Sequence, residues 1–325
     1  MINKNKKVIF IYGPTASGKS DFAEKLAAQI PAEIINMDSA QIYTPLTIGT
    51  AKPDWKKSPI KQHLFDIKDH PEHLTVHAYR KLVQEKIDEI HKRKRIPILV
   101  GGSGFYLKAL LFRLVSGTVS ENKAQFNIDI PEQDMWERLK EIDPKRALSI
   151  HPNDYYRIKR ALEIWFVTGK KPSEYKPIYD PIAPFVLVHV TREKKELYRR
   201  INKRAVQMVQ SGWLDEAKQL LGTPWELFVQ EKGIIGYTEM IGYLKHVYDL
   251  QHATEIIAQR TRNYAKRQET FWRMLKKIVT TAQKENSNTY GKIIELDLTY
   301  PDDDLYIKQL LDDVLTLDCG DYESN

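Results

Sequence analysis

The sequence predicts an α/β fold, in which helices flank a parallel sheet and a helical insertion interrupts the chain. Short runs of apolar, β-forming residues alternate with amphipathic helical patterns up to about residue 116, as in parallel strands joined by crossover helices. Residues 121–180 then lack a convincing strand pattern, and strand-like runs return at residue 185. The 325 residues, 42% hydrophobic and 29% charged, indicate a globular protein with a sizeable core and exclude a disordered or a membrane protein.

The first part of the chain contains three predicted strands and two predicted helices. The strands are short apolar runs that end at a glycine or a polar turn, at residues 8–12, 33–36 and 96–100. A helical pattern begins at Ser20, where apolar residues recur every third or fourth position, and a second occupies residues 78–92. This alternation of strands and helices predicts crossover connections within one parallel sheet.

The helical insertion is predicted at residues 117–184. It contains helical patterns at 135–142 and 154–168 and closes with a proline-rich stretch at 172–184. Because a buried strand pattern resumes directly afterwards, we expect the flanking segments to form a single α/β core.

That core is expected to comprise residues 1–116 and 185–325. After the insertion, amphipathic patterns separate two further apolar runs. We predict strands at 185–190 and 293–298, and helices at 194–211, 214–221, 236–250, 253–277 and 305–315.

The charge is unevenly distributed along the chain. Residues 286–325 hold two basic and ten acidic residues, a net charge of −8, whereas the whole chain carries +7, so the other 285 residues carry +15. A body this basic suits a polyanionic partner such as nucleic acid, although an ordinary basic protein has the same signature. The acidic tail is interpreted as a solvating extension, with a segment that docks on the protein as a mimic of RNA as the alternative.

A phosphate-binding loop follows the first predicted strand. Residues 13–20 (GPTASGKS) match G-x-x-x-x-G-K-[ST] and stand between a buried strand and a helix, the context that this motif requires. Its glycines let backbone N–H groups turn towards phosphate oxygens, and the helix N-terminus adds its positive end. The motif predicts a P-loop NTPase-like fold and a diphosphate site for a compound that it does not identify. The predicted diphosphate-binding residues are Gly13, Pro14, Thr15, Ala16, Ser17, Gly18, Lys19 and Ser20.

Two side chains of this loop carry further predicted roles. Lys19 supplies a full positive charge to the terminal phosphates, and the Ser20 hydroxyl is the candidate ligand of a magnesium ion.

Asp38 follows the second predicted strand. Ligands of doubly wound sheets bind beyond the carboxyl ends of the strands, so we expect Asp38 to face the ligand of the phosphate loop. Its carboxylate can coordinate magnesium through water or accept a proton from a nucleophile. An aspartate that caps a helix or closes a turn is the structural alternative.

An ordered series of motifs resembles the tRNA dimethylallyltransferase family. A lone phosphate loop is common to many families, whereas a series that extends from about residue 8 to 275 is specific. The motifs are GPTASGKS (13–20), DSAQIY (38–43), IGTAKP (48–53), HLFDI (63–67), IPILVGGSGFY (96–106), HPNDYYRIKRALE (151–163), TGKKPSE (168–174), IIGYTEM (234–240) and TRNYAKRQETFWR (261–273).

The resemblance implies a reaction. A dimethylallyl group would pass from dimethylallyl diphosphate to the exocyclic N6 amine of the adenosine 3′-adjacent to a tRNA anticodon, with release of diphosphate and with Mg²⁺ as cofactor. It also implies that Asp38 is the general base, that Ser103 helps to hold the target base, and that Lys19 stabilises charge on the departing diphosphate. The adenosine must leave its stack, which costs less in a loop than in a duplex.

Two basic clusters are the predicted contacts with the tRNA anticodon stem-loop. Residues 256–277 hold seven basic residues against one acidic residue, with three aromatic residues among them, and the resemblance places the cluster at 156–160 against the RNA. A solvated basic helix with its aromatic residues in the core is the alternative for the first cluster. The predicted tRNA-binding residues are Asp38, Ser39, Ala40, Gln41, Ser103, Tyr156, Arg157, Ile158, Lys159, Arg160, Lys266 and Arg267.

The phosphate loop alone leaves a second function open. A small-molecule or nucleotide kinase uses the same loop with an arginine-rich lid, which the insertion would supply. Asp38 and the length of the ordered resemblance favour the transferase. The lone Cys319 precludes an internal disulfide, and no stretch approaches the length of a membrane span, so we expect a cytoplasmic protein without membrane contact. No oligomerisation element is visible, so we expect a monomer.

Overall fold

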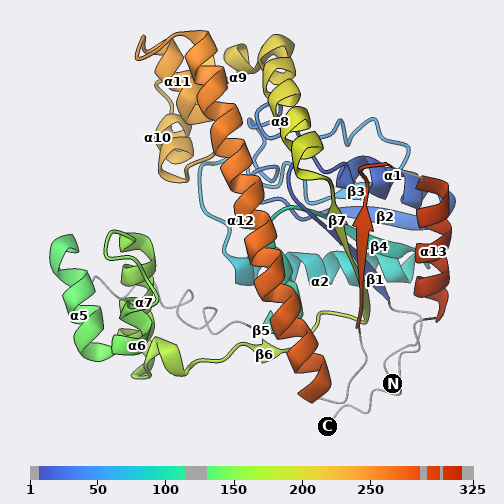
Figure 1. The fold of residues 1–325 in the computed structure, drawn as a ribbon, viewed down its shortest axis with the longest axis horizontal. Helices are drawn as coiled ribbons and strands as arrows, with labels where there is room; N and C mark the ends of the chain where they lie inside the picture. The colour runs from blue at the N-terminus through green and yellow to red at the C-terminus, as the bar shows by residue number, and fades with distance from the viewer. Residues whose placement is uncertain (1–6, 114–129, 286–290, 301–302, 317–325) are drawn as a thin grey trace.

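The computed structural model describes residues 7–113, 130–285, 291–300 and 303–316, and its centre is a six-stranded parallel sheet (Figure 1). The strand order β3-β2-β4-β1-β7-β8 confirms the predicted α/β class. Strand β3 is only two residues long, too short for a periodic pattern, and it was not predicted. The strands are β1 (Val8–Tyr12), β2 (Ala32–Asn36), β3 (Gln62–His63), β4 (Ile96–Gly101), β7 (Phe185–Thr191) and β8 (Gly291–Asp297).

Helices cover both faces of this sheet. In β1, Phe10 and Tyr12 pack on one side against α2 (Val76–Lys92), α3 (Gly104–Leu111) and α12 (Leu250–Glu285). Ile9 and Ile11 pack on the other side with α1 (Lys19–Gln29) and α13 (Asp303–Thr316). Because successive side chains of a strand point to opposite faces, a strand covered on both sides is apolar throughout, which is why VIFIY reads as one unbroken apolar run.

The described residues of the acidic tail, 291–300 and 303–316, belong to this core, so the interpretation as a solvating extension is wrong for them, and the strand predicted at 293–298 and the helix predicted at 305–315 are present. Strand β8 pairs with β7 in parallel along its whole length, from Gly291 to Asp297. Leu296, Ile307 and Leu310 are buried in the same apolar cluster as α1. Among the described side chains, Leu296 of β8 and Ile307 and Leu310 of α13 (Asp303–Thr316) are buried, whereas Glu295, Asp297 and Asp312 are exposed, as alternation along a strand and amphipathic spacing along a helix allow.

A group of helices stands over the carboxyl ends of the strands (Figure 1). Helix α8 (Lys194–Met208) passes through a π-helical segment, Val209–Trp213, into α9 (Leu214–Lys218). Two further helices, α10 (Pro224–Glu231) and α11 (Tyr237–Leu244), pack with the first part of α12 around a separate apolar cluster.

Helices α3 and α10 were not predicted. Helix α3 is apolar on nearly every side, so it shows no amphipathic period. Helix α10 has a start signal that was overlooked, because Thr223 caps it and Pro224 occupies its first turn.

The insertion forms a separate lobe beside the core (Figure 1). Helices α5 (Met135–Ile142), α6 (Pro144–Ala147) and α7 (Tyr155–Thr168) pack around their own apolar cluster. The chain returns through β6 (Ile178–Tyr179), which pairs antiparallel with β5 (Phe112–Arg113), so the expectation that 121–180 holds no strand is wrong for these two residues. The predicted start of the insertion at 117 lies outside the described residues. None of the described helices is long and apolar enough to cross a membrane.

Candidate active site

A cavity of about 300 Å³ lies over the carboxyl ends of β1, β2 and β4. Its wall is made by the phosphate loop, the segment after β2, helix α8, the end of α10 and the middle of α12. Thr15 lines it at the loop, Asp38 after β2 and Arg267 on α12. Thr15 is the residue of the predicted loop that lines this space, and it does so together with the predicted aspartate.

The phosphate loop has the backbone of an anion site. Gly18 has a φ of 99° and precedes α1 without a capping side chain. A Cβ at Gly13 would stand 2.4 Å from the Val190 carbonyl oxygen, so the close approach of β7 requires glycine there. Within the described residues, the N–H groups of Gly18, Lys19 and Ser20 have no hydrogen-bond acceptor. Free N–H groups at a helix N-terminus bind anions such as phosphate.

Four long side chains hold this loop in place. Gln268 of α12 accepts from the Thr15 N–H at 2.9 Å and donates to the Gly102 carbonyl at 2.8 Å. Arg192 and Arg200 donate to loop carbonyls at 3.1 and 2.9 Å, and Arg204 donates to the Thr15 hydroxyl at 2.8 Å. None of these four residues was predicted from the sequence. The signal for two of them was present, because Arg200 and Arg204 stand four apart on a helix that follows a strand next to the loop.

Lys19 is half-buried beside the loop, and its ammonium donates to the Pro14 carbonyl at 3.2 Å. Burial, with the positive charge of Arg204, lowers the pKa of Lys19 to about 8, although Asp38 opposes this shift. Ser17 is fully buried, and Ala16 is held in the left-handed region with a φ of 64°. Ser20 is exposed in the first turn of α1.

Asp38 is partly exposed to the cavity and has one oxygen committed to a turn. Its Oδ1 accepts from the Ala40 N–H at 2.8 Å, and Asn36 Oδ1 accepts from the N–H of Asp38 at 2.9 Å. Asp38 therefore does close a turn, which was the structural alternative, and it also lines the cavity. Its negative charge acts there on three cations, Lys19, Arg204 and Lys232.

Ser103 and Gln41 hold loops of the cavity wall. The buried Ser103 hydroxyl accepts from the Ser39 N–H at 2.9 Å, which joins the ends of β2 and β4. The Gln41 amide donates to the carbonyls of Thr50 and Ala51. Of the neighbouring predicted residues, Ser39 and Ala40 line the cavity.

Glu216 of α9 is a further residue that the sequence analysis missed. Its carboxylate accepts from the consecutive N–H groups of Thr47, Ile48 and Gly49 at 2.8–3.1 Å and from the Tyr237 hydroxyl at 2.6 Å. It thereby fixes the loop that contributes Gly49 and Thr50 to the cavity wall. The N–H groups that it binds are 167–169 residues away in sequence, so no local motif reveals it.

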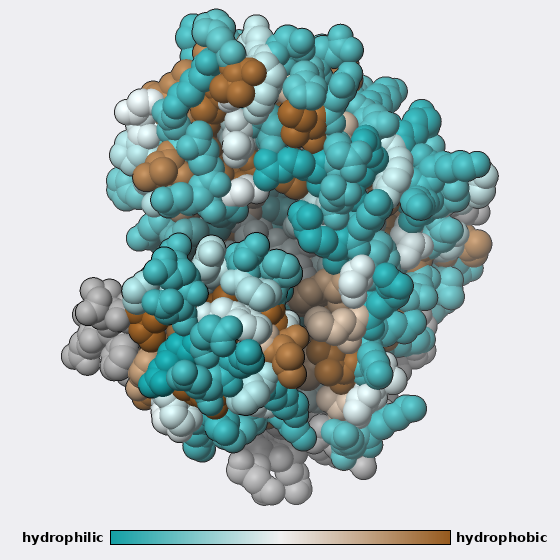
Figure 2. Space-filling view, turned by 60° about the vertical axis from the view of Figure 1, so that its left-hand side comes forward, coloured by the Kyte–Doolittle hydropathy of each residue, from teal (hydrophilic) through white to brown (hydrophobic). Residues whose placement is uncertain are grey.

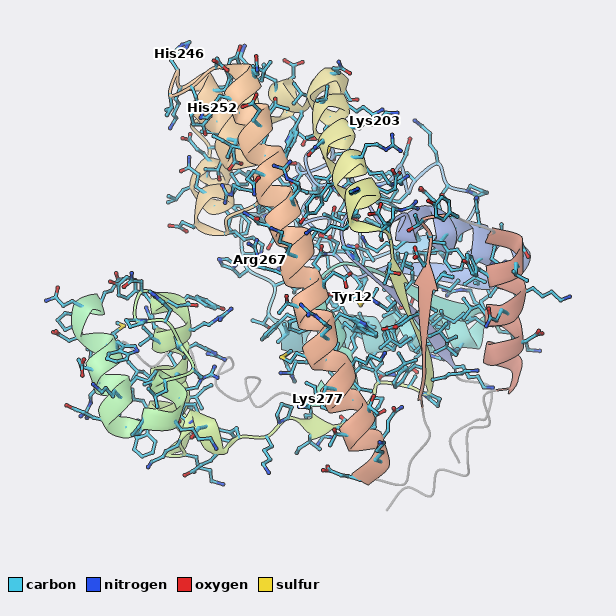
Figure 3. All side chains as sticks on the ribbon, viewed as in Figure 1. Tyr12, Lys203, His246, His252, Arg267 and Lys277 are labelled. Carbon is cyan, nitrogen blue, oxygen red and sulfur yellow. The ribbon has the colours of Figure 1, made fainter. Side chains whose placement is uncertain are left out.

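The basic cluster of α12 divides between the cavity and the surface. Both Lys266 and Arg267 are exposed, but only Arg267 is among the residues that line the cavity, and its guanidinium carbon lies 5.7 Å from the centroid of the Tyr264 ring (Figure 3 labels Arg267). Trp272 is buried and stacks on His189 with ring centroids 4.2 Å apart, which confirms it as a core residue.

The cluster on the insertion is largely exposed at the start of α7. Tyr156 is 81% exposed, the Arg157 side chain is 67% exposed, and Lys159 is exposed as well. Arg160 pairs with Glu163 at 2.8 Å. Ile158 is fully buried in the core of the insertion, so its prediction as an RNA contact is wrong. Figure 2 shows a recess between this lobe and the helices above it.

Comparison with known proteins gives consistent matches. A family model described as IPP transferase matches residues 41–275. The tRNA dimethylallyltransferase of Thermotoga maritima is 36% identical over 278 residues, which covers 84% of this chain and 91% of the relative. The tRNA dimethylallyltransferase 1 of Citrifermentans bemidjiense is 39% identical over 275 residues, covering 83% and 90% of the two chains.

Two solved structures resemble this one over nearly the whole chain. The full-length tRNA isopentenylpyrophosphate transferase of Bacillus halodurans is 34% identical, with a TM-score of 0.62 and coverage of 95% of this chain and 96% of the other. A eukaryotic dimethylallyltransferase described as acting on tRNA is 28% identical, with a TM-score of 0.79 and coverage of 98% and 82%.

Proposed function

The chain belongs to the IPP transferase family of prenyl-transferring enzymes that modify tRNA, and we propose how its cavity performs the reaction. A dimethylallyl group passes from dimethylallyl diphosphate to the N6 amine of the adenosine 3′-adjacent to the anticodon. The observation that supports this most directly is that Thr15 of the phosphate loop and the Asp38 carboxylate line one cavity, which a basic helix also lines. The loop receives the diphosphate, and the carboxylate meets the amine.

The diphosphate is the leaving group, and the loop end of the cavity stabilises its charge. The free N–H groups at the start of α1, the Lys19 ammonium and the Arg204 guanidinium converge there. Donors that are already in place when charge develops lower the barrier to its departure. The allylic C1–O bond breaks, and the electron pair leaves with the diphosphate.

Asp38 accepts the proton that the amine loses. As the N6–C1 bond forms, the nitrogen becomes positively charged, and the Asp38 carboxylate takes its proton. The hydrogen bond from Ala40 to Oδ1 orients this carboxylate and leaves the second oxygen for the amine. The Ser103 hydroxyl fixes the backbone of Ser39, the residue that follows the general base Asp38.

We propose that a magnesium ion would bind near the phosphate loop through the Ser20 hydroxyl and the diphosphate, with few or no carboxylate ligands from the protein. Within the described residues, no group of three or more His, Cys, Asp or Glu side chains stands ready to hold a metal. Magnesium prefers few protein ligands together with phosphate oxygens and water, and the exposed Ser20 hydroxyl at the start of α1 suits that role. When bound, the ion would neutralise charge on the diphosphate.

We propose that the anticodon stem-loop lies in the recess between the insertion and the helices above it (Figure 2). Arg267 and Lys266 contact it from α12, and Tyr156, Arg157 and Lys159 contact it from α7. Their exposure leaves the charges and the aromatic ring free to meet phosphates and unpaired bases. We also propose a cytoplasmic monomer, for which light scattering tests the oligomeric state.

The test of this function is transfer of the labelled prenyl group. The protein is incubated with dimethylallyl diphosphate labelled in the prenyl carbon and an anticodon stem-loop that carries the target adenosine. A matched RNA has inosine at that position and therefore lacks the amine. Label on the first RNA alone supports the proposal. ATP hydrolysis without labelled RNA would support the kinase alternative instead.

A further inference from the structure

Lys232 is a cation at the cavity that the function described so far does not use. It caps the C-terminal end of α10 and lines the cavity together with Asp38 and Arg267. Its ammonium lies 5.3 Å from the ring centroid of Tyr43 and 5.7 Å from that of Phe228. Burial lowers the pKa of this ammonium, and the carboxylate of Asp38 opposes the shift.

Arg260 and Lys245 are paired with carboxylates, whereas Lys232 has no such partner among the described residues. Arg260 also lines the cavity and is paired with Glu239, and Lys245 is paired with Glu226 on the outer side of α10. Within the described residues, the Lys232 ammonium has no carboxylate within 4 Å and no hydrogen-bond acceptor. A half-buried cation that only aromatic rings accompany is available to an anionic ligand.

The reaction brings two anionic substrates to one cavity. Arg204 is hydrogen-bonded to the phosphate loop and is assigned to the diphosphate, and Arg260 is paired with Glu239. Lys232 and Arg267 are the other two basic residues that line the cavity, and neither has a carboxylate partner among the described residues. Lys232 is at the C-terminal end of α10, and Arg267 is on α12. Figure 1 shows α10 on the side of the molecule that faces the insertion, and α1, which follows the phosphate loop, on the opposite side.

The backbone next to Lys232 leaves room for a ligand. Gly233 has a φ of 64°, and a Cβ placed there would meet no atom within 4 Å. Phosphate contacts fix the register and orientation of a bound nucleic acid, and an ammonium on a flexible stem is a suitable partner for one phosphate.

We propose that Lys232 binds a phosphate that flanks the target adenosine and so positions its amine against Asp38. This inference rests on the proposed function, because it assumes an RNA substrate. Lys232 is then a positioning residue on the RNA side of the cavity, and it makes no contact with the diphosphate.

The variant Lys232→Met tests this role, with Lys245→Met as the matched control. Affinity for the anticodon stem-loop is measured at several salt concentrations without dimethylallyl diphosphate, together with the KM of each substrate. We expect Lys232→Met to bind RNA about tenfold more weakly and to lose about 0.7 from the slope of log affinity against log salt, the effect of one phosphate contact. Lys232→Arg restores both, and the KM of dimethylallyl diphosphate is unchanged in every variant.

A modified RNA shows which phosphate is bound. A neutral methylphosphonate replaces the phosphate on the 5′ or the 3′ side of the target adenosine. One of these RNAs is expected to bind wild type about tenfold more weakly and to lose nothing further in Lys232→Met, because the two changes remove the same contact.

Three results overturn the inference. The first is that neither modified RNA shows this coupling. The second is a reduced kcat with unchanged RNA affinity, which would make Lys232 a partner of Asp38 instead. The third is a raised KM for the diphosphate alone. If Lys232→Met does not fold, Lys232→Gln is measured in its place with the same readouts. If the wild-type protein neither binds nor modifies the stem-loop, the result contradicts the proposed function itself and not this inference alone.

Discussion

The two ends of the cavity are built differently. At the phosphate loop, Arg192 before α8 and side chains from α8 and α12 bind the loop, and the close approach of Val190 determines the residue type at Gly13. On the RNA side, Lys232 and Arg267 lie against aromatic rings without carboxylate partners among the described residues, and Tyr156 and Arg157 on the insertion are largely exposed.

The difference matches the two proposed ligands. A small diphosphate is bound best by donors that are fixed before it arrives, because little ordering is then left to oppose binding. A stem-loop touches a wide surface through many weak, screened contacts, and its affinity depends on salt. Changes at the loop end should therefore act on one substrate with large effects, and changes on the RNA side should act on the other with small ones.

Asp38 lies between the two ends, so its loss should reduce turnover without weakening either substrate. The variant Asp38→Asn keeps an oxygen to accept from the Ala40 N–H and removes the base. We expect the single-turnover rate to fall about a thousandfold while RNA affinity stays within about twofold. The control Asp54→Asn alters an exposed aspartate that pairs with Lys57 and should change neither. A loss of RNA binding would show instead that Asp38 is structural.

Arg204→Ala tests the loop end. It removes the guanidinium that bonds the Thr15 hydroxyl, and we expect the KM of dimethylallyl diphosphate to rise about thirtyfold, as for the loss of a charge-assisted hydrogen bond. RNA affinity should not change. Arg199→Ala, on the exposed side of α8 where Arg199 pairs with Glu196, is the control. Weaker RNA binding in Arg204→Ala would break the separation between the ends.

The loop end should also respond to pH. In the free protein the pKa of Lys19 is about 8, below its ordinary value, so the ammonium is lost as the pH rises through that value. Because the charged form binds the diphosphate, the KM of dimethylallyl diphosphate should rise by up to about tenfold from roughly pH 7 to pH 9. In Lys19→Arg the charge persists and the KM should stay flat. A flat profile in wild type would contradict the proposed role of this ammonium.

Arg157→Ala on the insertion should have the smallest effect. Its side chain is mostly exposed, and its pairing with Asp154 contributes little. We expect RNA affinity to fall about fivefold with a shallower salt dependence, and kcat at saturating RNA to be unchanged. Arg138→Ala, which alters an exposed arginine on α5 of the same lobe, is the control. An unchanged salt slope would remove α7 from the RNA interface.

The sequence predicted those parts of the fold whose pattern is local. Strands β1, β2, β4 and β7 are short apolar runs, and the amphipathic helices α2 and α5 were placed within two residues of their observed bounds. The tail was interpreted as a solvating extension because it holds ten acidic residues against two basic ones. That count ignores the positions of its apolar residues. The buried positions of Leu296, Ile307 and Leu310 depend on a sheet face that the sequence does not display.

The candidate site was predictable to the same extent. The phosphate loop and Asp38 belong to motifs whose chemistry can be recognised in a few residues. Gln268, Arg204 and Glu216 were missed because each acts on backbone or hydroxyl groups more than 160 residues away. Ile158 was misassigned because it stands between basic residues of a helix that turns it inward.

Direct binding of each substrate to wild type, Arg204→Ala and Arg157→Ala tests the separation of the two ends most directly. Calorimetric titrations with dimethylallyl diphosphate and with the anticodon stem-loop are made on the same three proteins. Our account predicts a crossed result, in which Arg204→Ala weakens only the diphosphate and Arg157→Ala weakens only the RNA. Weakening of both ligands in either variant, with thermal unfolding unchanged, would contradict it.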